Sequence, residues 1–326
     1  MGAQTPIATG QLRSAVSVCA VLVTYHPDVP TLIAALRAVA AQVAQVVIVD
    51  NATAGLTDSL GPVVAELGVT VLAQPGNVGL AAAQNVGIAA ARAAGHSHVL
   101  ILDQDSEAAP GMVAGLVAAW RQLTADGVRV GAVGPTFHDP REARPAPFVR
   151  VAFPMSRKLW CDAPDGLVRC DFLISSGALI ALDTLADVGD MDAGLFIDNV
   201  DMEWSFRARS RGYALFGVCA AAMTHRLGDA RQPVLGGRAH VVRHAPVRLY
   251  FIMRNRVALY RLPHTPRVWI AQDVPRIVAK FVICSVLVGP RLRNVRYMLR
   301  GLLDGVRGRS GPCPIEAPEH DGEAAR

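Results

Sequence analysis

The chain of 326 residues is short of several features that mark whole classes of protein. No run of 18 or more apolar residues is free of charge, so the sequence offers no convincing transmembrane helix. The first residues lack the pattern of a secretory signal peptide, and we therefore expect a cytoplasmic protein. The 6 cysteines show no Cys-x-x-Cys spacing, which argues against a zinc site and against a disulfide framework.

Lysine is almost absent, because Lys158 and Lys280 are the only two among 32 basic residues. Acids are scarce in one long segment: between Arg231 and Arg300 there are fourteen basic residues and a single acid, Asp273. Basic charge concentrated in this way indicates an anionic partner, such as nucleic acid, a membrane surface or phosphate groups. Hydrophobic residues make up 52% of the chain, which excludes a disordered protein and allows a sizeable core.

The first third of the chain alternates between two hydrophobic periods. Short β-rich runs predict strands, and longer amphipathic segments between them predict helices. The expected strands are 18–24, 46–49, 69–72 and 98–102, and the expected helices are 31–44 and 80–94. Strands and helices that alternate at this spacing predict βαβ units, and hence an α/β fold whose parallel sheet is covered on both faces.

The remainder of the chain follows other patterns. Residues 131–216 predict mixed strands and loops rather than further βαβ repeats. From Ala245 onward the pattern is helical and amphipathic, with further helices expected over 274–288 and 295–303. Arg-rich helices with an apolar face either lie at a membrane interface or pack on a catalytic domain, and the sequence leaves both open.

Polar residues gather where the predicted strands end, namely Thr24, Asp50, Asn51, Asp103 and Asp105. In open α/β sheets this edge is where ligands bind. Two carboxylates one residue apart after a buried strand suit a divalent cation such as Mg²⁺, although an ordinary polar loop also carries acids there. Asp50 and Asn51 suit hydrogen bonds to a base or ribose, or equally a turn.

Two further groups of polar residues have both a functional and an ordinary explanation. Asn77 and Asn85 lie at the start of a helix of small residues, where they either meet a ligand or cap the helix. Asp198, Asp201 and Glu203 lie beside aromatic residues, where desolvation tunes a carboxylate as a general base. Acids also favour the first turn of a helix for its dipole alone.

Taken in order, these motifs resemble glycosyltransferase family 2, which has the GT-A fold. The matching blocks are Val-Thr24-Tyr-His, Val-Asp50-Asn51, Asn77-Val-Gly-x5-Asn85, Asp103-Gln-Asp105 and Asp201-Met-Glu-Trp-Ser-Phe-Arg207. Phe172-Leu-Ile-Ser-Ser-Gly177, Leu195-Phe-Ile-Asp198-Asn-Val-Asp201 and His225-Arg-Leu-Gly look like the rhamnosyltransferase branch. Within that branch the chain is similar, over residues 17–311, to the enzymes that add the second rhamnose in rhamnolipid biosynthesis.

The resemblance implies roles for individual residues. For the nucleotide-sugar donor it implies a site made by Thr24, Asp50, Asn51, Asn77, Asn85 and Asp103. For a Mg²⁺ or Mn²⁺ ion on the donor diphosphate it implies the ligands Asp103, Asp105 and His225; alone, a histidine such as His225 is more often structural. For the acceptor it implies Ser175, Ser176, Gly177 and Trp204.

The catalytic base is the one role that the resemblance leaves with a choice. The usual motif of the family is Glu-Asp, with an arginine six residues after the aspartate. Counting back from Arg207 selects Asp201, although Val200 then stands in place of the glutamate. Asp198 is the second choice, and Asn199 then stands where the family has its base. We expect Asp201, because it keeps the carboxylate.

The resemblance further implies transfer of L-rhamnose from dTDP-L-rhamnose to a lipid-linked hydroxyl, with inversion. Monorhamnolipid is the expected acceptor, and a polyprenyl-linked O-antigen or cell-wall glycan is the alternative. We expect peripheral association with the inner face of the cytoplasmic membrane and no nucleic-acid partner, since a basic nucleic-acid-binding protein would leave the strand-end acids unexplained. The expected parts are a disordered end (1–16), a GT-A domain (17–243), a helical extension (244–311) and an acidic flexible tail (312–326).

Overall fold

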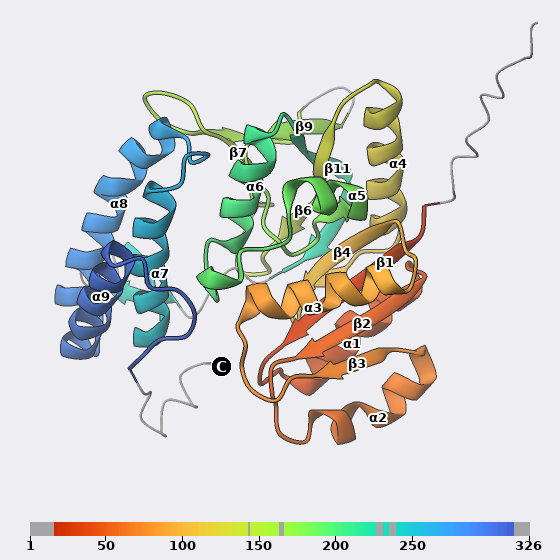
Figure 1. Cartoon of the computed structure of the whole chain (residues 1–326), viewed down its shortest axis with the longest axis horizontal. Helices are drawn as coiled ribbons and strands as arrows, with labels where there is room; N and C mark the ends of the chain where they lie inside the picture. Colours follow the sequence, from red (N-terminus) through yellow and green to blue (C-terminus); the bar gives the residue numbers. More distant parts are fainter. Residues whose placement is uncertain (1–15, 143, 163–165, 226–230, 235–238, 316–326) are drawn as a thin grey trace, which may run out of the picture.

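In the computed structural model the chain is described over residues 16–142, 144–162, 166–225, 231–234 and 239–315. A mixed sheet forms the centre, with strands in the order β3-β2-β1-β4-β10-β6-β11-β5 and β9 paired with β11 (Figure 1). The strands of this sheet are β1 (Val18–Thr24), β2 (Gln45–Asp50), β3 (Thr70–Ala73), β4 (His98–Asp103), β5 (Glu107–Ala108), β6 (Val130–His138), β9 (Leu167–Cys170), β10 (Leu179–Ala181) and β11 (Ala214–Thr224). Strands β1 to β4 are parallel, whereas β10 runs antiparallel to both β4 and β6.

Alternate side chains of the parallel strands enter two separate cores. In β1, Cys19, Val21 and Val23 point to one face of the sheet and Val18, Ala20 and Leu22 to the other. The first face is covered by α3 (Leu80–Ala93), α5 (Leu182–Val188) and α6 (Val200–Ser210). The second face is covered by α1 (Val29–Ala40), α2 (Leu56–Leu67) and α4 (Met112–Ala125). This double cover requires strands that are apolar on both faces, as the sequence predicts.

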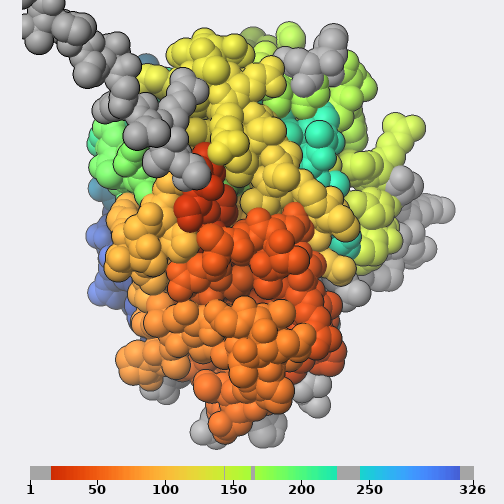
Figure 2. Space-filling model, turned by 90° about the vertical axis from the view of Figure 1, so that its right-hand side faces the viewer, coloured from red at the N-terminus to blue at the C-terminus, as the bar shows by residue number. Residues whose placement is uncertain are grey.

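The chain after residue 245 forms three helices at one end of the molecule. They are α7 (Pro246–Tyr260), α8 (Arg267–Val286) and α9 (Arg291–Val306), at the left of Figure 1. Helix α9 lies close against α7 because Gly305 has no side chain: a Cβ there would lie 2.8 Å from the Arg254 carbonyl oxygen. Figure 2 shows another face, formed largely by the red to yellow N-terminal part of the chain.

Two small sheets lie outside the central one. Strands β7 (Phe148–Arg150) and β8 (Arg157–Leu159) form a hairpin, and β12 (Arg231–Val234) pairs with β13 (Ala239–Val242). The hairpin reaches helix α8, because Gln272 donates to the Ala152 carbonyl at 2.6 Å. The short helix η1 (Ala193–Leu195) precedes α6. The prediction of mixed strands and loops over 131–216 therefore describes most of this region but omits α5, whereas α6 is the helix expected to carry Arg207.

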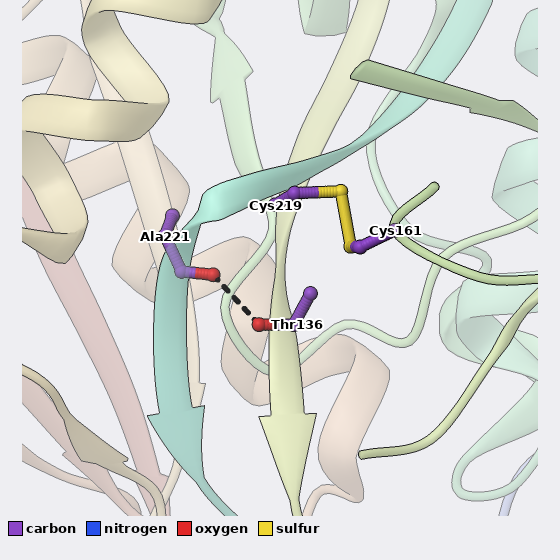
Figure 3. The surroundings of a disulfide bond; sticks show 4 residues. All are labelled: Thr136, Cys161, Cys219 and Ala221. Atoms are coloured by element: carbon purple, nitrogen blue, oxygen red, sulfur yellow. Dashed lines mark hydrogen bonds between the residues drawn. A yellow bond between two sulfur atoms is a disulfide. The ribbon is translucent and has the colours of Figure 1, made fainter. Parts of the chain in front are cut away.

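The expectation about cysteines needs one correction. Cys161, in the loop after β8, and Cys219, in β11, form a disulfide (Figure 3). Two half-cystines 58 residues apart carry no spacing signal, so the pair was not predictable from the sequence. The bond lies where β11 is irregular: its register with β6 shifts between Val218 and Ala222.

The predicted chain ends fall largely outside the described residues, since 1–15 and 316–326 are not part of them. Residues before that limit are packed: Cys313 and Ile315 contact the aromatic cluster of Tyr250, Phe251 and Tyr297. No helix in the described part of the chain combines the length and the apolar character needed to cross a bilayer.

Candidate active site

The carboxyl ends of β1 and β2 form the first part of the site. Thr24, at the end of β1, donates its hydroxyl to the Asp50 carboxylate at 2.8 Å, and the Thr53 backbone N–H donates to the other carboxylate oxygen at 2.8 Å. Thr24 and Asp50 are both buried. These two hydrogen bonds hold the Asp50 carboxylate in one orientation. Thr24 therefore serves to position Asp50.

The loop before α3 closes over this edge. The Asn51 carboxamide oxygen accepts from the Val78 backbone N–H at 3.3 Å, and the Asn77 side-chain oxygen accepts from the Gly79 N–H at 2.9 Å. Asn51 and Asn77 therefore fix the loop over residues 77–79 against the end of β2. Gly79 has a φ of +86° and lies against Phe196, so that a Cβ at this position would be 2.6 Å from the phenyl ring.

A cluster of two carboxylates and an imidazole lies where β4 ends and where the chain leaves β11. Asp103, Asp105 and His225 each offer a ligand atom, and these atoms lie within 4.8 Å of one another. The His225 Nε2 is 3.8 Å from an Asp103 carboxylate oxygen, and its Nδ1 is 3.6 Å from an Asp105 oxygen. The sequence separates these residues by 120 positions, and the fold brings them together because β11 runs parallel to β6 toward the same edge as β4.

Buried hydroxyls support this cluster from behind. Ser106 and the His225 Nδ1 are hydrogen-bonded at 2.8 Å, and Ser106 and Ser176 share a hydrogen bond at 2.6 Å. The Asp103 backbone N–H donates to the Ser176 hydroxyl at 3.2 Å. A hydrogen bond at Nδ1 orients the ring and leaves Nε2 for a ligand, which is the usual arrangement behind a metal-binding histidine.

The electrostatics of the cluster suit a cation. Burial raises the pKa of Asp103, the charge of Asp105 adds to the rise, and His225 and Arg248 oppose it. Although burial opposes it, Asp105 and Asp103 together raise the pKa of His225. Two carboxylates and an imidazole fit Mg²⁺ or Mn²⁺, which take oxygen ligands and accept an imidazole in the Mn²⁺ case.

The two candidate bases lie in different surroundings. Asp198 is paired with Arg248 of α7, whose Nη2 is 3.2 Å from its carboxylate. Asp201, in the first turn of α6, accepts the Met202 N–H at 2.8 Å, and the backbone of Ser175 also bonds to it. Burial raises the pKa of Asp201 to about 6, and the charges of Asp103 and Asp198 add to the rise. A carboxylate with such a pKa, close enough to Asp103 to feel its charge, is suited to accept a proton near neutral pH.

The loop that carries Asp198 and leads into α6 has a strained backbone. Phe196, Asp198 and Asn199 all have positive φ, between 63° and 65°. Such conformations persist only where the surroundings impose them. Here Asn255 of α7 donates its amide to the carbonyls of Leu195, Ile197 and Asp198, at 2.7 to 3.0 Å.

Arg254 completes this clamp on the acid loop, which we define as residues 194–199. Its guanidinium donates to the carbonyls of Gly194 and Leu195, at 3.0 and 2.7 Å, and to that of Gly311. Phe196 stacks on Phe251 of α7 with 5.0 Å between ring centroids. Helix α7 is therefore part of the candidate active site rather than a separate appendage.

Several sequence-predicted residues lie in places that need correction. Asn85 uses both ends of its carboxamide on the Met191 backbone, at 2.9 Å each, so it holds the chain before the acid loop and does not face a donor. Trp204 is buried and donates its indole N–H to the Gly189 carbonyl. Ser176 and Gly177 are also buried, and Ser176 bonds to Ser106 and to the Asp103 backbone. Ser175, which is half-buried, and Trp204 line one small cavity together with Asp201, and so lie beside the candidate base.

Glu203 stabilises helix α6 through hydrogen bonds rather than facing the site. It is buried and accepts two hydrogen bonds from Arg207, both at 2.9 Å, and it bonds to His264 at 2.9 Å. Arg207 in turn donates to the carbonyls of Val188 and Asp190. This network anchors α6, which carries Asp201, and these hydrogen bonds account for Arg207 without a ligand.

The disulfide and β11 position His225. Thr136 of β6 donates its hydroxyl to the Ala221 carbonyl at 3.0 Å across the irregular part of β11, two residues from Cys219 (Figure 3). The strand then regains its pairing with β6 up to Thr224, the residue before His225. The irregular segment of β11, held by the disulfide and by the Thr136 hydrogen bond, thus sets the position from which His225 reaches Asp103 and Asp105.

Sequence reasoning missed Arg248, Arg254 and Asn255 as residues of the site. A signal was present, because Arg254-Asn255 interrupts the apolar stripe of a predicted helix, and buried polar residues on such a stripe need partners. In the sequence these arginines were indistinguishable from the rest of the basic segment. Only the fold shows that Arg254 is buried, whereas Arg261, Arg267 and Arg291 of the same basic segment are exposed.

Comparison with known proteins relates the chain to glycosyltransferases. Residues 19–173 match the family model described as Glycosyl transferase family 2. The curated "dTDP-rhamnosyl transferase RfbF" of Shigella flexneri is 28% identical over 300 residues, which cover 90% of this chain and 97% of that protein.

Two solved structures share the fold. The structure of GalNAc-T7 with UDP, GalNAc and Mn²⁺ gives a TM-score of 0.58 at 15% identity, over 90% of this chain, which spans 56% of the length of that one. The structure of S. aureus TarS 1-349 in complex with UDP-GlcNAc gives 0.56 at 14% identity, over 90% of this chain and 82% of that one. The predicted fold class, an α/β fold of GT-A type, is confirmed.

Proposed function

We propose that this chain is a rhamnosyltransferase of glycosyltransferase family 2 that uses dTDP-L-rhamnose as donor. The observation that carries the proposal is the cluster of Asp103, Asp105 and His225 at the end of a GT-A-like sheet, beside the buried Asp50. The match of residues 19–173 to the family and the similarity to a dTDP-rhamnosyl transferase support it. In this proposal Asp50 and Asn51 bind the nucleoside, and the loop with Asn77 lies next to it.

Asp103, Asp105 and His225 would hold Mg²⁺ or Mn²⁺. When bound, such an ion neutralises charge on the diphosphate as it leaves. The chain's own contribution is to hold three ligands at one edge, with Ser106 and Ser176 fixing their orientation. The donor set tolerates either ion, since carboxylates suit both.

Asp201 is the proposed base. It would take the proton from the acceptor hydroxyl as that oxygen attacks the anomeric carbon, so that a β-linked donor gives an α-L-rhamnoside by a single displacement with inversion. Asp198 is less suited, because the Arg248 guanidinium stabilises its charged form. Asp201 has no such cation at hydrogen-bond distance among the interactions of the described residues.

We further propose that the acceptor is a lipid-linked sugar met at a membrane surface. The outer faces of α8 and α9 carry exposed apolar side chains at helical spacing: Val274, Val278, Val282 and Val286 on α8, and Leu292, Leu299, Leu303 and Val306 on α9. Exposed arginines flank both rows: Arg267, Arg276, Arg291, Arg293, Arg296 and Arg307. Apolar side chains beside cations are the pattern of a helix that lies in an anionic lipid interface.

The acids of these two helices do not oppose such an interface. Asp273 and Asp304 are both buried, Asp273 bonded to Tyr260 at 2.5 Å and Asp304 to Arg300 at 2.9 Å. Neither helix therefore exposes a carboxylate. Monorhamnolipid is the acceptor we propose, and a polyprenyl-linked O-antigen or cell-wall glycan is the second candidate.

The deciding experiment is transfer by purified protein from dTDP-L-rhamnose to monorhamnolipid, with and without Mg²⁺, with products identified by mass spectrometry. Metal-dependent dirhamnolipid supports donor and acceptor together. Rhamnose transfer only to a polyprenyl-linked glycan supports the second acceptor, and no use of dTDP-L-rhamnose in the presence of either acceptor contradicts the proposal. Cosedimentation with vesicles that contain phosphatidylglycerol, against neutral vesicles, tests the membrane surface.

A further inference from the structure

Lys280 is an unusual residue in this chain. It is one of two lysines, and it lies in the middle of α8 on the side that faces α7. Its neighbours one turn away on that side, Ile277 and Cys284, pack against Leu249 and Met253 of α7. Yet the half-buried ammonium forms no hydrogen bond or ion pair with any residue in the described part of the chain.

Other charges act on this ammonium. Burial lowers the pKa of Lys280, Asp198 opposes the shift, and Arg256 and Arg248 add to it. Asp273 forms an ion pair with Arg256 and accepts a hydrogen bond from Tyr260, so it is not a counter-ion for Lys280. A half-buried lysine without a counter-ion is costly, and an anion bound beside it would offset that cost.

Lys280 lies on the other side of the acid loop from the carboxyl ends of β1 and β2, where the donor is proposed to bind. Phe196 of that loop lies against Gly79 of the donor-side loop on one side and stacks on Phe251 of α7 on the other. Asp198 reaches Arg248 on the α7 side. Lys280 lies between Ile277 and Cys284 of α8, which share a hydrophobic cluster with Leu249 of α7, and so lies on the side of Arg248 rather than of Gly79.

We propose that Lys280 and Arg248 form a subsite for an anionic group of the acceptor, beside the acid loop. The inference rests on the proposed function, because it assigns the acceptor of that reaction. An ammonium and a guanidinium together recognise an oxyanion, either a carboxylate or a phosphate. The opposite side of α8 carries the exposed Val278 and Val282, so the subsite lies on the same helix as the proposed lipid-facing row.

Both proposed acceptors supply such a group, a carboxylate on monorhamnolipid and a diphosphate on a polyprenyl-linked sugar. The subsite would hold the acid group of the lipid so that its sugar hydroxyl comes to Asp201. Arg248 would then turn part of its hydrogen bonding from Asp198 to the acceptor. A neutral lipid glycoside would bind without this contribution.

Equilibrium binding tests the subsite without requiring turnover. The probes are monorhamnolipid below its micellar concentration, its methyl ester, a polyprenyl diphosphate-linked sugar and dTDP, each titrated into the wild type and Lys280→Met. Lys280→Arg keeps the charge, and Lys158→Met makes the same change at an exposed lysine. Methionine matches the length of lysine and removes a half-buried charge, so the fold is expected to tolerate it.

We expect Lys280→Met to weaken binding of at least one acidic lipid by about tenfold or more, the effect of one charge-assisted hydrogen bond. Binding of the methyl ester and of dTDP should stay unchanged, and Lys280→Arg and Lys158→Met should bind as the wild type does. Which acidic lipid responds tells carboxylate from diphosphate. The subsite is refuted if no acidic lipid responds, if ester and acid weaken equally, or if dTDP binding falls.

Failure of the subsite is distinguishable from failure of the proposed function. Charge-dependent lipid binding without rhamnose transfer would overturn the donor and leave the subsite in place. Rhamnose transfer by a Lys280→Met variant with unchanged acceptor KM would leave the function in place and overturn the subsite.

Discussion

Replacing Asp201 by asparagine should inactivate the enzyme and stabilise its fold. The reason is the burial that raises the pKa of this carboxyl from 3.8 to about 6. At neutral pH the folded protein holds a charge that its surroundings disfavour, whereas the unfolded chain holds it in water. The difference corresponds to about 3 kcal/mol, at 1.36 kcal/mol for each pKa unit, as an upper limit. Asparagine keeps the oxygen that accepts the Met202 N–H and removes the charge.

The pH dependence of this gain has a defined sign. Since the folded-state pKa lies above the unfolded one, the native state of the wild type binds the proton more tightly, and its stability falls as pH rises from 3.8 through about 6. The advantage of Asp201→Asn over the wild type should therefore be full at pH 7.5, about half as large at pH 5 and nearly absent below pH 4. Urea unfolding of both proteins at these pH values measures it.

Asp198→Asn is the matched control, three residues before Asp201 at the end of the acid loop. It removes the carboxylate that pairs with Arg248, so it should lower the free energy of unfolding or leave it unchanged. If Asp201→Asn is less stable than the wild type at pH 7.5, or if its advantage is the same at every pH, the reasoning about the burial of Asp201 is wrong.

Three other predictions concern the same site. Turnover should fall about tenfold per pH unit below about pH 6, because protonated Asp201 accepts no proton; a kcat/KM profile that stays flat to pH 5 would contradict this. Chelation by EDTA, or Asp105→Asn, should lower transfer at least about a hundredfold, with Mg²⁺ or Mn²⁺ restoring the chelated enzyme but not the variant; an EDTA-resistant rate would remove the metal from the site. Asn255→Asp replaces a donor to three carbonyls with a charge and should cost about 2–4 kcal/mol in urea unfolding, along with kcat, whereas near-wild-type stability would show that the acid loop needs no clamp.

The N-terminal half of the fold was predictable because its strands are apolar on both faces. Each of the four predicted strands is present within two residues of its expected ends, and so is α3; α1 lies within four residues of its expected ends. Helices α2 and α4 were not predicted. In α2, Gly61 and Pro62 interrupt the helical pattern. Helix α4 begins soon after the segment that carries Asp103 and Asp105, where the sequence pattern predicted no helix.

The site residues were predictable where they share one short sequence motif. They were less predictable where their contacts depend on packing between distant segments. Asp103 and Asp105 follow a buried strand in one short motif, and His225 came only through resemblance. Asn85 was misjudged because a polar residue in a small-residue helix equally serves a backbone segment 106 residues away. Trp204 lines a cavity with Asp201 while its indole bonds to a backbone carbonyl, and its role toward an acceptor stays a prediction.

The most direct test of the proposed chemistry is rhamnose transfer from dTDP-L-rhamnose by the matched pair Asp201→Asn and Asp198→Asn, with dTDP binding measured alongside. We expect Asp201→Asn to lose about a thousandfold or more in kcat with dTDP affinity unchanged, and Asp198→Asn to keep measurable turnover. Loss of turnover confined to Asp198→Asn would instead make that residue the base and contradict the assignment made from burial and pairing.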